Sequence, residues 1–221
     1  MELDHVFVCT ARDAPEAERL RALGLAEGTT NVHRGQGTAN RRFFFANAML
    51  ELLWVQDEIE AASDVVSRTG LLERWRGRGD PACGFGFCFR PSPVPSDATP
   101  FATWDYHPPY LPPSVGIPVA TNSNIVSEPM LFCIPMGGRP DAAPLAHRQP
   151  LHHELGVREL TRAALVSPHA ERPSVELRAA VAAGLLALRR GPEYRLELTF
   201  DGAMRGGEAD LGPELPLVLR W

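Results

Sequence analysis

The chain has 221 residues, of which 44% are hydrophobic and 22% charged, so it can bury a globular core and is not disordered as a whole. Its 27 acidic residues outnumber its 22 basic residues, all of which are arginine, and the net charge of −5 provides no global basic field for binding nucleic acid. No apolar run reaches the roughly 18 residues that cross a membrane, and the first residues lack the pattern of a signal peptide, so we expect a cytoplasmic protein without a membrane partner.

Residues 1–57 are predicted to form a β-α-β-β-β unit. The first strand is rich in β-branched and aromatic residues, and the helix after it begins near Asp13, has Glu16 three positions later and ends at Gly24. A polar segment that contains glycine then leads to three more strands. The predicted elements are strands over 3–9, 29–33, 42–45 and 50–55, and a helix over 13–23.

Residues 58–149 are predicted to connect this unit to a second one. A helix is expected over 57–75, with an aspartate N-cap as its first residue and Gly70 weakening its middle. Most of the 21 prolines follow, and within this part only 84–90 and 130–134 have the pattern of strands. Proline favours extended chain wrapped over a surface, so we expect this segment to cover the mouth of a cavity.

Residues 150–221 are predicted to form a second, diverged copy of the first unit. Residues 159–167 align without gaps on residues 2–10, which places Arg162 opposite His5. The remaining predicted elements are a helix over 174–190 and strands over 194–200 and 215–221. We therefore predict an α+β fold of paired βαβββ modules whose curved, mixed sheets surround a cavity.

Two potential metal ligands lie inside strongly apolar strands. His5 is near the start of the first strand, and Glu51 is in the last strand of the same unit. Burying an ionised glutamate without a partner is costly, so this position needs a physical reason. Imidazole and carboxylate are ligands for Zn²⁺, Fe²⁺ and Mn²⁺, and two strands of one sheet can bring them to one ion. The alternative is simple strand alternation, with Glu51 facing solvent and His5 hydrogen-bonded locally.

The segment from His33 to Asn40 is a second candidate for ligand contact. It contains glycines but lacks the Gly-Lys-Ser/Thr ending of a phosphate loop and precedes a strand, which argues against nucleotide binding. The glycines permit close backbone approach, and His33, Thr38 and Asn40 supply donors and acceptors toward the inside of the sheet. The alternative is a tight connection whose side chains hydrogen-bond their own backbone.

Three motifs of the first unit carry a resemblance to a known family. They are Leu-Asp-His-Val at 3–6, Asn-Val-His-Arg-Gly-Gln-Gly-Thr-Ala-Asn at 31–40, and Met-Leu-Glu-Leu-Leu-Trp at 49–54. Together they resemble the glyoxalase-like domain family of the vicinal-oxygen-chelate superfamily. The resemblance implies a small-molecule substrate and a divalent metal, Zn, Fe, Mn or Ni, held by His5 and Glu51, with Glu51 acting as ligand or as proton-transfer base.

The chain departs from the full ligand set that the resemblance implies. Arg162 stands where the second unit would place its histidine, and apolar residues of 215–221 stand where it would place its glutamate. The open positions would go to water, to substrate, or to a third protein ligand or substrate contact such as His33 or His153. Arg162 could bind a substrate carboxylate or Glu51, or simply face solvent.

The cysteines lie in apolar runs without the spacing of a zinc site, so we expect buried free thiols. They are Cys9, Cys83, Cys88 and Cys133.

Two functions and one assembly state follow as expectations. The chain is a metal-dependent lyase, isomerase or dioxygenase-like enzyme acting on a small oxygen-rich substrate, or a non-catalytic protein that binds and sequesters a small molecule. The closing segment 215–221 is apolar and ends in Trp221, and an uncovered strand edge of that composition would aggregate. We therefore expect a homodimer, the alternative being that Trp221 packs within its own monomer.

Overall fold

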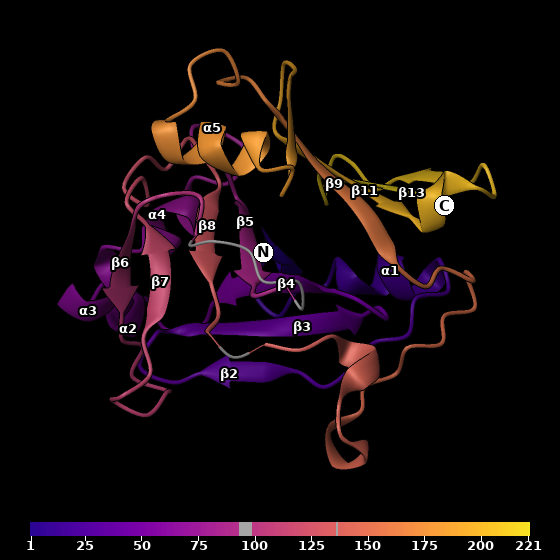
Figure 1. Cartoon of the computed structure of the whole chain (residues 1–221), viewed down its shortest axis with the longest axis horizontal. Helices are drawn as coiled ribbons and strands as arrows, with labels where there is room; N and C mark the ends of the chain where they lie inside the picture. Colours follow the sequence, from indigo (N-terminus) through magenta and orange to yellow (C-terminus); the bar gives the residue numbers. More distant parts are fainter. Residues whose placement is uncertain (93–98, 136) are drawn as a thin grey trace.

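The computed structural model describes residues 1–92, 99–135 and 137–221, which form two mixed sheets with short helices (Figure 1). This arrangement confirms the predicted α+β class. The strands are β1 (Glu2–Cys9), β2 (Asn31–His33), β3 (Thr38–Phe44), β4 (Met49–Val55), β5 (Phe85–Arg90), β6 (Thr103–Tyr106), β7 (Ile117–Ala120), β8 (Met130–Cys133), β9 (Leu160–Ser167), β10 (Ala187–Arg190), β11 (Arg195–Phe200), β12 (Glu208–Asp210) and β13 (Leu217–Arg220). The α-helices are α1 (Ala17–Ala22), α2 (Glu58–Ala61), α3 (Asp64–Ser67), α4 (Leu71–Arg76) and α5 (Val175–Ala182).

The larger sheet has eight strands in the order β2-β3-β4-β1-β5-β8-β7-β6. β1 and β5 pair antiparallel at its centre, β4 lies parallel to β1, and β8 lies parallel to β5. From the centre to the edge, one half has the order β1-β4-β3-β2 and the other half has the matching order β5-β8-β7-β6. Figure 1 shows that the sheet is strongly curved, because β2 and β3 run horizontally in this view whereas β6, β7 and β8 run vertically.

The smaller sheet has five strands in the order β10-β9-β11-β13-β12, and its centre repeats the pairing of the larger sheet. β9 pairs with β11 as β1 pairs with β5, and the register skips one residue at the matching place, Asp4 in β1 and Thr161 in β9. His5 therefore corresponds to Arg162, as the gap-free alignment predicts. The parallel neighbour of β9 is β10, so the residue that corresponds to Glu51 is Ala187 and does not lie in the closing strand.

The two faces of the larger sheet differ because side chains alternate along each strand. Val8 of β1 and Leu52 of β4 point to one face, where they join apolar residues of β5, α1 and the smaller sheet in the main core. His5 and Glu51 are on the opposite face, next to residues of a separate, smaller apolar cluster. The alternation thus places the two candidate ligands on the same side of the sheet, away from the main core.

The helix predicted over 57–75 is in fact three short helices, α2, α3 and α4. Asp57 caps α2 as predicted, since its side chain accepts hydrogen bonds from the backbone N–H groups of Ile59 and Glu60. The continuous helix is wrong because Ser63, between α2 and α3, has an extended ψ of 153°, and Gly70, before α4, has a left-handed φ of +68°.

Two other helices are shorter than predicted for related reasons. α1 starts late because Asp13 and Ala14 have φ values of 65° and 45°, outside the right-handed helical region. The helix predicted over 174–190 is wrong in its second half, where Gly184 has a φ of +72° and the chain then forms β10. The apolar residues keep a helical spacing through the segment that forms β10, so the pattern did not show where the helix ends.

The closing strand is not an edge of its sheet. β13 lies between β11 and β12, so the open edge expected for 215–221 does not exist. Trp221 follows β13 and packs, partly buried, against the main core. A homodimer would therefore need another surface. The sequence did not predict β6, β7 and β12, which are short strands of three or four residues.

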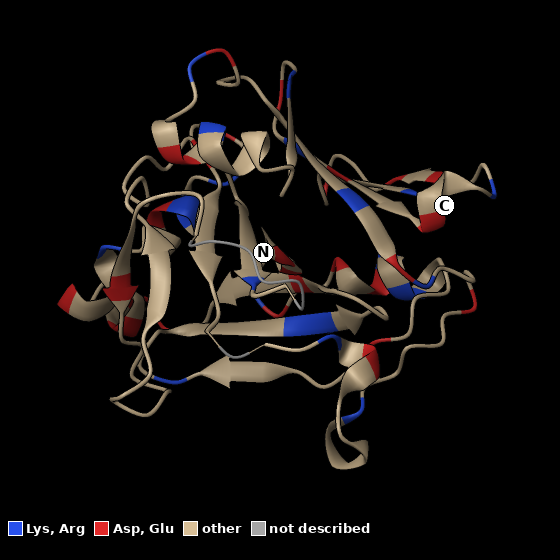
Figure 2. Ribbon diagram, in the orientation of Figure 1, with Lys and Arg blue, Asp and Glu red and all other residues tan. Residues whose placement is uncertain are grey.

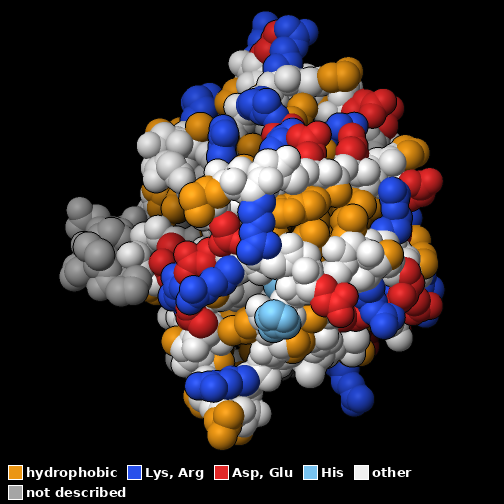
Figure 3. Space-filling model, turned by 90° about the vertical axis from the view of Figure 1, so that its right-hand side faces the viewer, with side chains coloured by type: hydrophobic (Ala, Val, Ile, Leu, Met, Phe, Trp, Pro, Cys, Tyr) orange, Lys and Arg blue, Asp and Glu red, His pale blue; other side chains and the backbone are white. Residues whose placement is uncertain are grey.

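On the face seen in Figure 3 arginines and acidic residues are interspersed, and Figure 2 shows charged residues on strands of both sheets. Arg74 and Arg90 are buried cations, and the Arg74 guanidinium donates to the backbone carbonyls of Thr69, Ser123, Ile125 and Glu128. The four cysteines are buried and free, which confirms their prediction. No helix in the described ranges is long and apolar enough to cross a membrane.

Candidate functional site

A cavity of about 190 Å³ lies against the face of the larger sheet that carries His5 and Glu51. Glu51 does alternate away from the core, but it points into this cavity and is only 5% exposed. The cavity is lined by His5, Phe7, His33, Gln36, Asn40, Arg42, Met49, Glu51, Leu53, Leu71, Tyr110, Met130, Phe132 and Ile134. The structure therefore brings together four of the predicted site residues, His5, His33, Asn40 and Glu51.

His5 is oriented by its neighbour Asp4. The His5 Nδ1 atom lies 2.6 Å from Asp4 Oδ1, and because a carboxylate only accepts hydrogen bonds, Nδ1 carries the proton. Arg90 holds Asp4 in place, with 3.0 Å between Arg90 Nη1 and Asp4 Oδ2. In the neutral ring the other nitrogen of His5, Nε2, has its lone pair directed toward Glu51. A ligand histidine held by a carboxylate is the usual arrangement at protein metal sites.

Glu51 is fixed at one oxygen and free at the other. Asn40 donates from its side-chain nitrogen to Glu51 Oε1, while the Asn40 oxygen accepts from the backbone N–H of Asn31 at 2.9 Å. The remaining oxygen, Oε2, lies 3.6 Å from His5 Nε2. Two ligand atoms about 2.1 Å from one ion are separated by roughly this distance at tetrahedral angles, so the pair fits a shared divalent cation.

The charges around His5 favour a cation at this place. Burial lowers the pKa of His5, but the hydrogen bond and charge of Asp4, together with the charge of Glu51, outweigh burial and raise the pKa above its ordinary value. Burial raises the pKa of Asp4, but His5 and Arg90 outweigh it and lower the pKa. The site between the two carboxylates thus stabilises positive charge, carried by a proton or by a metal ion.

The hairpin between β2 and β3 supplies the second predicted group. Gly35 and Gly37 have φ values of 80° and 75°, and a Cβ on Gly35 would lie 2.5 Å from Pro109 Cβ, so the backbone here makes the close approach that the glycines predicted. Gly35 therefore allows the proline-rich segment to pack closely over the hairpin. In that segment Tyr110 lines the cavity and packs at a tilt against His33, with 4.9 Å between ring centroids.

Three further predicted residues lie elsewhere. Thr38 is buried behind His33, with its Oγ1 atom 2.9 Å from His33 Nδ1, and does not line the cavity. His153 lies outside the cavity with both ring nitrogens engaged, one accepting from the Ala26 backbone N–H and one donating to the Phe44 carbonyl, each at 3.0 Å. Arg162 is exposed on β9 and also lies outside the cavity.

The other half of the sheet has no matching pair of ligands. Gly86 and Cys88 of β5 are the direct neighbours of Phe7 and His5, and Met130 and Phe132 of β8 are in turn their neighbours, so the same face is largely apolar there. Within the described part of the chain, only Asp4, His5 and Cys88 place three possible ligand atoms within 4.8 Å of one another. Burial raises the pKa of the Cys88 thiol well above its ordinary value, and Asp4 is ion-paired with Arg90, so this trio is poorly suited to a metal.

Sequence reasoning did not identify four residues of the site: Asp4, Gln36, Arg42 and Tyr110. Arg42 belongs to the cationic stretch of β3 that is visible in Figure 2, and it donates to the carbonyl oxygen of Thr29 at 2.7 Å. Asp4 could have been found from its place beside His5 inside an apolar strand. Tyr110 could not, because its position depends on how the proline-rich segment folds back over the hairpin.

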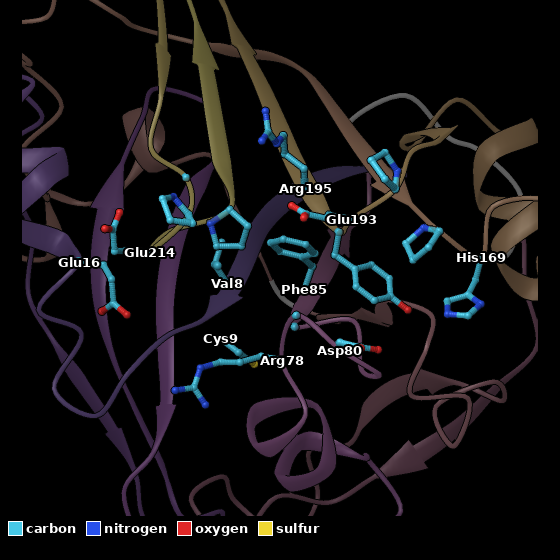
Figure 4. A pocket seen from close by; sticks show the side chains of 18 residues that line it. Val8, Cys9, Glu16, Arg78, Asp80, Phe85, His169, Glu193, Arg195 and Glu214 are labelled. Atoms are coloured by element: carbon cyan, nitrogen blue, oxygen red, sulfur yellow. The ribbon is translucent and has the colours of Figure 1, made fainter.

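A larger cleft of about 570 Å³ lies where the two sheets meet, apart from this cavity (Figure 4). Val8 and Phe85 of the larger sheet and Arg195 of the smaller one are among its lining residues. None of the predicted site residues lines it.

The fold and the cavity together define a class of protein in which a curved sheet of two similarly ordered halves encloses a histidine–carboxylate pair. Residues 3–103 match the family model of the glyoxalase-like domain, in agreement with the resemblance that the sequence motifs carry. A hypothetical protein from Staphylococcus aureus has a similar crystal structure, with a TM-score of 0.54 over 99% of this chain and 98% of that chain. The two share 10% sequence identity, so the likeness concerns the fold alone. Comparison with curated proteins gave no match.

Proposed function

We propose that the protein is an enzyme that binds a small oxygen-rich molecule in the cavity and catalyses a lyase, isomerase or dioxygenase-like reaction with a divalent metal held by His5 and Glu51. The observation that carries the proposal is the 3.6 Å separation of His5 Nε2 and Glu51 Oε2 at the cavity wall. Asp4 binds the other ring nitrogen of His5, and Asn40 binds the other oxygen of Glu51. His5 Nε2 and Glu51 Oε2 are therefore the two atoms available to a metal ion.

The donor set fits a metal with open coordination positions. An imidazole nitrogen and a carboxylate oxygen suit Zn²⁺, Fe²⁺, Mn²⁺ and Ni²⁺ alike, and water or substrate would complete the shell. Such a metal, when bound, polarises a carbonyl oxygen and stabilises the negative charge that develops on it.

The residues of the chain then have distinct tasks. Asp4 keeps the proton on His5 Nδ1, which leaves Nε2 as a lone-pair donor. Asn40 holds one oxygen of Glu51, so that the other can bind the cation or move a proton on the substrate. The apolar residues of β8 and Tyr110 exclude water from one side of the cavity.

The metal content of purified protein tests this proposal. We expect Zn, Fe, Mn, Ni or Co to copurify when chelators are omitted, and His5→Ala and Glu51→Ala each to lose most of it. His152→Ala is a matched control, because His152 is exposed and does not line the cavity. Metal-free wild-type protein whose thermal stability does not increase on adding these ions would exclude the proposal.

Non-catalytic binding of a small molecule is the second candidate. The observation that favours it is the apolar half of the cavity, where Phe132 packs edge-on against His5 with 5.5 Å between ring centroids and Met130 lies alongside. A sequestering protein would be stabilised by its ligand with or without chelator, following RT ln(1 + [L]/Kd). The enzyme would lose that response on chelation.

A further inference from the structure

His33 is connected to a buried tyrosine through a chain of three hydrogen bonds. Tyr106 Oη lies 3.0 Å from Gln36 Oε1, Gln36 Nε2 lies 2.8 Å from Thr38 Oγ1, and Thr38 Oγ1 lies 2.9 Å from His33 Nδ1. Tyr106, Gln36 and Thr38 are all buried. The chain begins in the buried tyrosine and ends at the cavity wall.

Such a chain can run in two directions, because hydroxyl and amide groups both donate and accept. If Tyr106 donates, Gln36 donates to Thr38, Thr38 donates to His33 Nδ1, and the proton of the neutral ring is on Nε2. If the direction is reversed, His33 Nδ1 donates, the amide of Gln36 is turned round, and Nε2 has a lone pair.

The buried tyrosine decides between these directions. In the reversed chain Tyr106 would accept from Gln36, and its own proton would need a second acceptor. Gln36 is the one hydrogen-bond partner of the Tyr106 hydroxyl among the residues that the structure describes. A buried donor without an acceptor is costly, so Tyr106 donates to Gln36, and Gln36 donates to Thr38. Thr38 Oγ1 has His33 Nδ1 as its other partner among the described residues, so the Thr38 proton goes to His33 for the same reason.

We propose that His33 is a neutral hydrogen-bond donor that directs its Nε2 proton at an oxygen of the bound molecule, and that it is not a third metal ligand. Thr38, Gln36 and Tyr106 are positioning residues that fix this tautomer. The inference deepens the proposed function, on which its reference to a bound molecule rests.

The surroundings of His33 agree with this role. Burial lowers the pKa of His33. The negative charge of Glu51 opposes this change and the positive charge of Arg42 adds to it, and the net effect is a lowered pKa. The ring is therefore neutral near pH 7. A neutral imidazole N–H suits an oxygen on which negative charge develops, since it donates without giving up its proton. The ligand class is therefore a compound whose carbonyl, enolate or carboxylate oxygen lies opposite the His5 and Glu51 pair.

Nitrogen NMR of the full chain labelled with ¹⁵N-histidine tests the tautomer directly, without substrate or metal. We expect His33 to show Nε2–H in the wild type at neutral pH with chelator present. A protonated ring, or Nδ1–H, would overturn the proposal. His153 is an internal reference, because its Nδ1 accepts from a backbone N–H and its Nε2 donates to a carbonyl.

Gln36→Glu is the sharpest variant, because it has nearly the same shape and its carboxylate only accepts. Both Tyr106 and Thr38 must then donate to it, so Thr38 accepts from His33 and the ring changes to Nδ1–H. Tyr106→Phe removes the donor that sets the direction and should give a mixture of the two tautomers. Unchanged Nε2–H in both folded variants, with His153 unaltered, would show that the chain does not position His33.

Zinc separates this inference from the proposed function. On adding Zn²⁺, the signals of His5 should shift while His33 keeps its Nε2 proton. Loss of that proton would make His33 a ligand and overturn the proposal. If neither histidine responds, the metal-dependent function fails, while the Nε2–H tautomer still supports the assignment of His33.

Oxalate, a small dianion with adjacent oxygens, tests the donor role in the zinc-loaded protein. We expect His33→Leu to weaken oxalate binding by about ten-fold with zinc affinity unchanged, and the control His152→Leu to change neither. Equal oxalate affinity in wild type and His33→Leu, or no binding of oxalate to the wild type, would reject the donor role.

Discussion

Asp4 Oδ1 lies 2.6 Å from His5 Nδ1, although the two residues are consecutive in one strand. In a regular strand their side chains would point to opposite faces. The contact is possible because the register skips Asp4, a bulge that redirects the side chain. The same bulge recurs at Thr161 in the smaller sheet, where Arg162 follows it. The bulge is thus part of the repeated framework, whereas the histidine–carboxylate pair occurs in one sheet only.

Asp4→Asn should weaken metal binding by about 10- to 100-fold, because the amide no longer holds the tautomer or raises the basicity of His5 as a ligand. Titration of the apo protein with Zn²⁺ measures the effect. Glu2→Gln is the matched control, since Glu2 also pairs with Arg90, at 2.8 Å, without touching His5. Equal losses in the two variants would mean that Asp4 acts only through Arg90.

Arg74→Met should destabilise the protein by about 3–5 kcal/mol, because it leaves several buried carbonyl oxygens without a donor. Urea unfolding measures the loss. Arg76→Met on the same helix removes an exposed ion pair with Glu58 and should cost less than about 1 kcal/mol. Similar costs for both variants would contradict the role given to Arg74.

His153 should make stability depend on pH. Burial and the charge of His152 lower the pKa of His153 in the folded state, against the opposing effect of its hydrogen bond to Phe44. The unfolded chain therefore takes up the proton first, and stability is lost as pH falls below about 6.5. His153→Gln can form the same two hydrogen bonds without titrating, so its free energy of unfolding should fall less between pH 7.5 and 5.5. Parallel curves for variant and wild type would refute this.

The thiols should be inert in the folded protein. Burial raises the pKa of Cys9 and Cys83 to about 12 and that of Cys133 to about 11, and Cys88 is also fully buried. A chromogenic disulfide reagent at pH 8 should find almost no reactive thiol until the protein is unfolded in urea, when all four should react. Rapid reaction of one thiol in the native state would indicate local opening around that residue.

Much of the first unit could be predicted from sequence because its strands have clear patterns. β1, β4 and β5 are long apolar runs, and the alternation in β4 placed Glu51 apart from Leu52. Helix boundaries were less predictable, since a left-handed residue such as Gly70 or Ala14 interrupts a helix without disturbing its apolar periodicity.

The rest of the site depends on contacts between distant segments. Tyr106 lies 70 positions from Gln36 in sequence, and nothing in the local pattern of either residue indicates that they meet. His153 was chosen for its residue type and Arg162 for its alignment with His5, and the fold places both outside the cavity. The side of the sheet on which Glu51 lies was predictable and a proline-rich cover was expected, but the sequence did not indicate that Tyr110 is the residue of this cover that lines the cavity.

The position of a bound metal tests the central claim most directly. Crystals of the protein grown with Zn²⁺ and measured at the zinc absorption edge should show an anomalous peak about 2.0–2.2 Å from both His5 Nε2 and a Glu51 oxygen, with Asp4 still on His5 Nδ1. A peak at Cys88 or His153, or no peak beside His5 and Glu51 at saturating zinc, would contradict the claim.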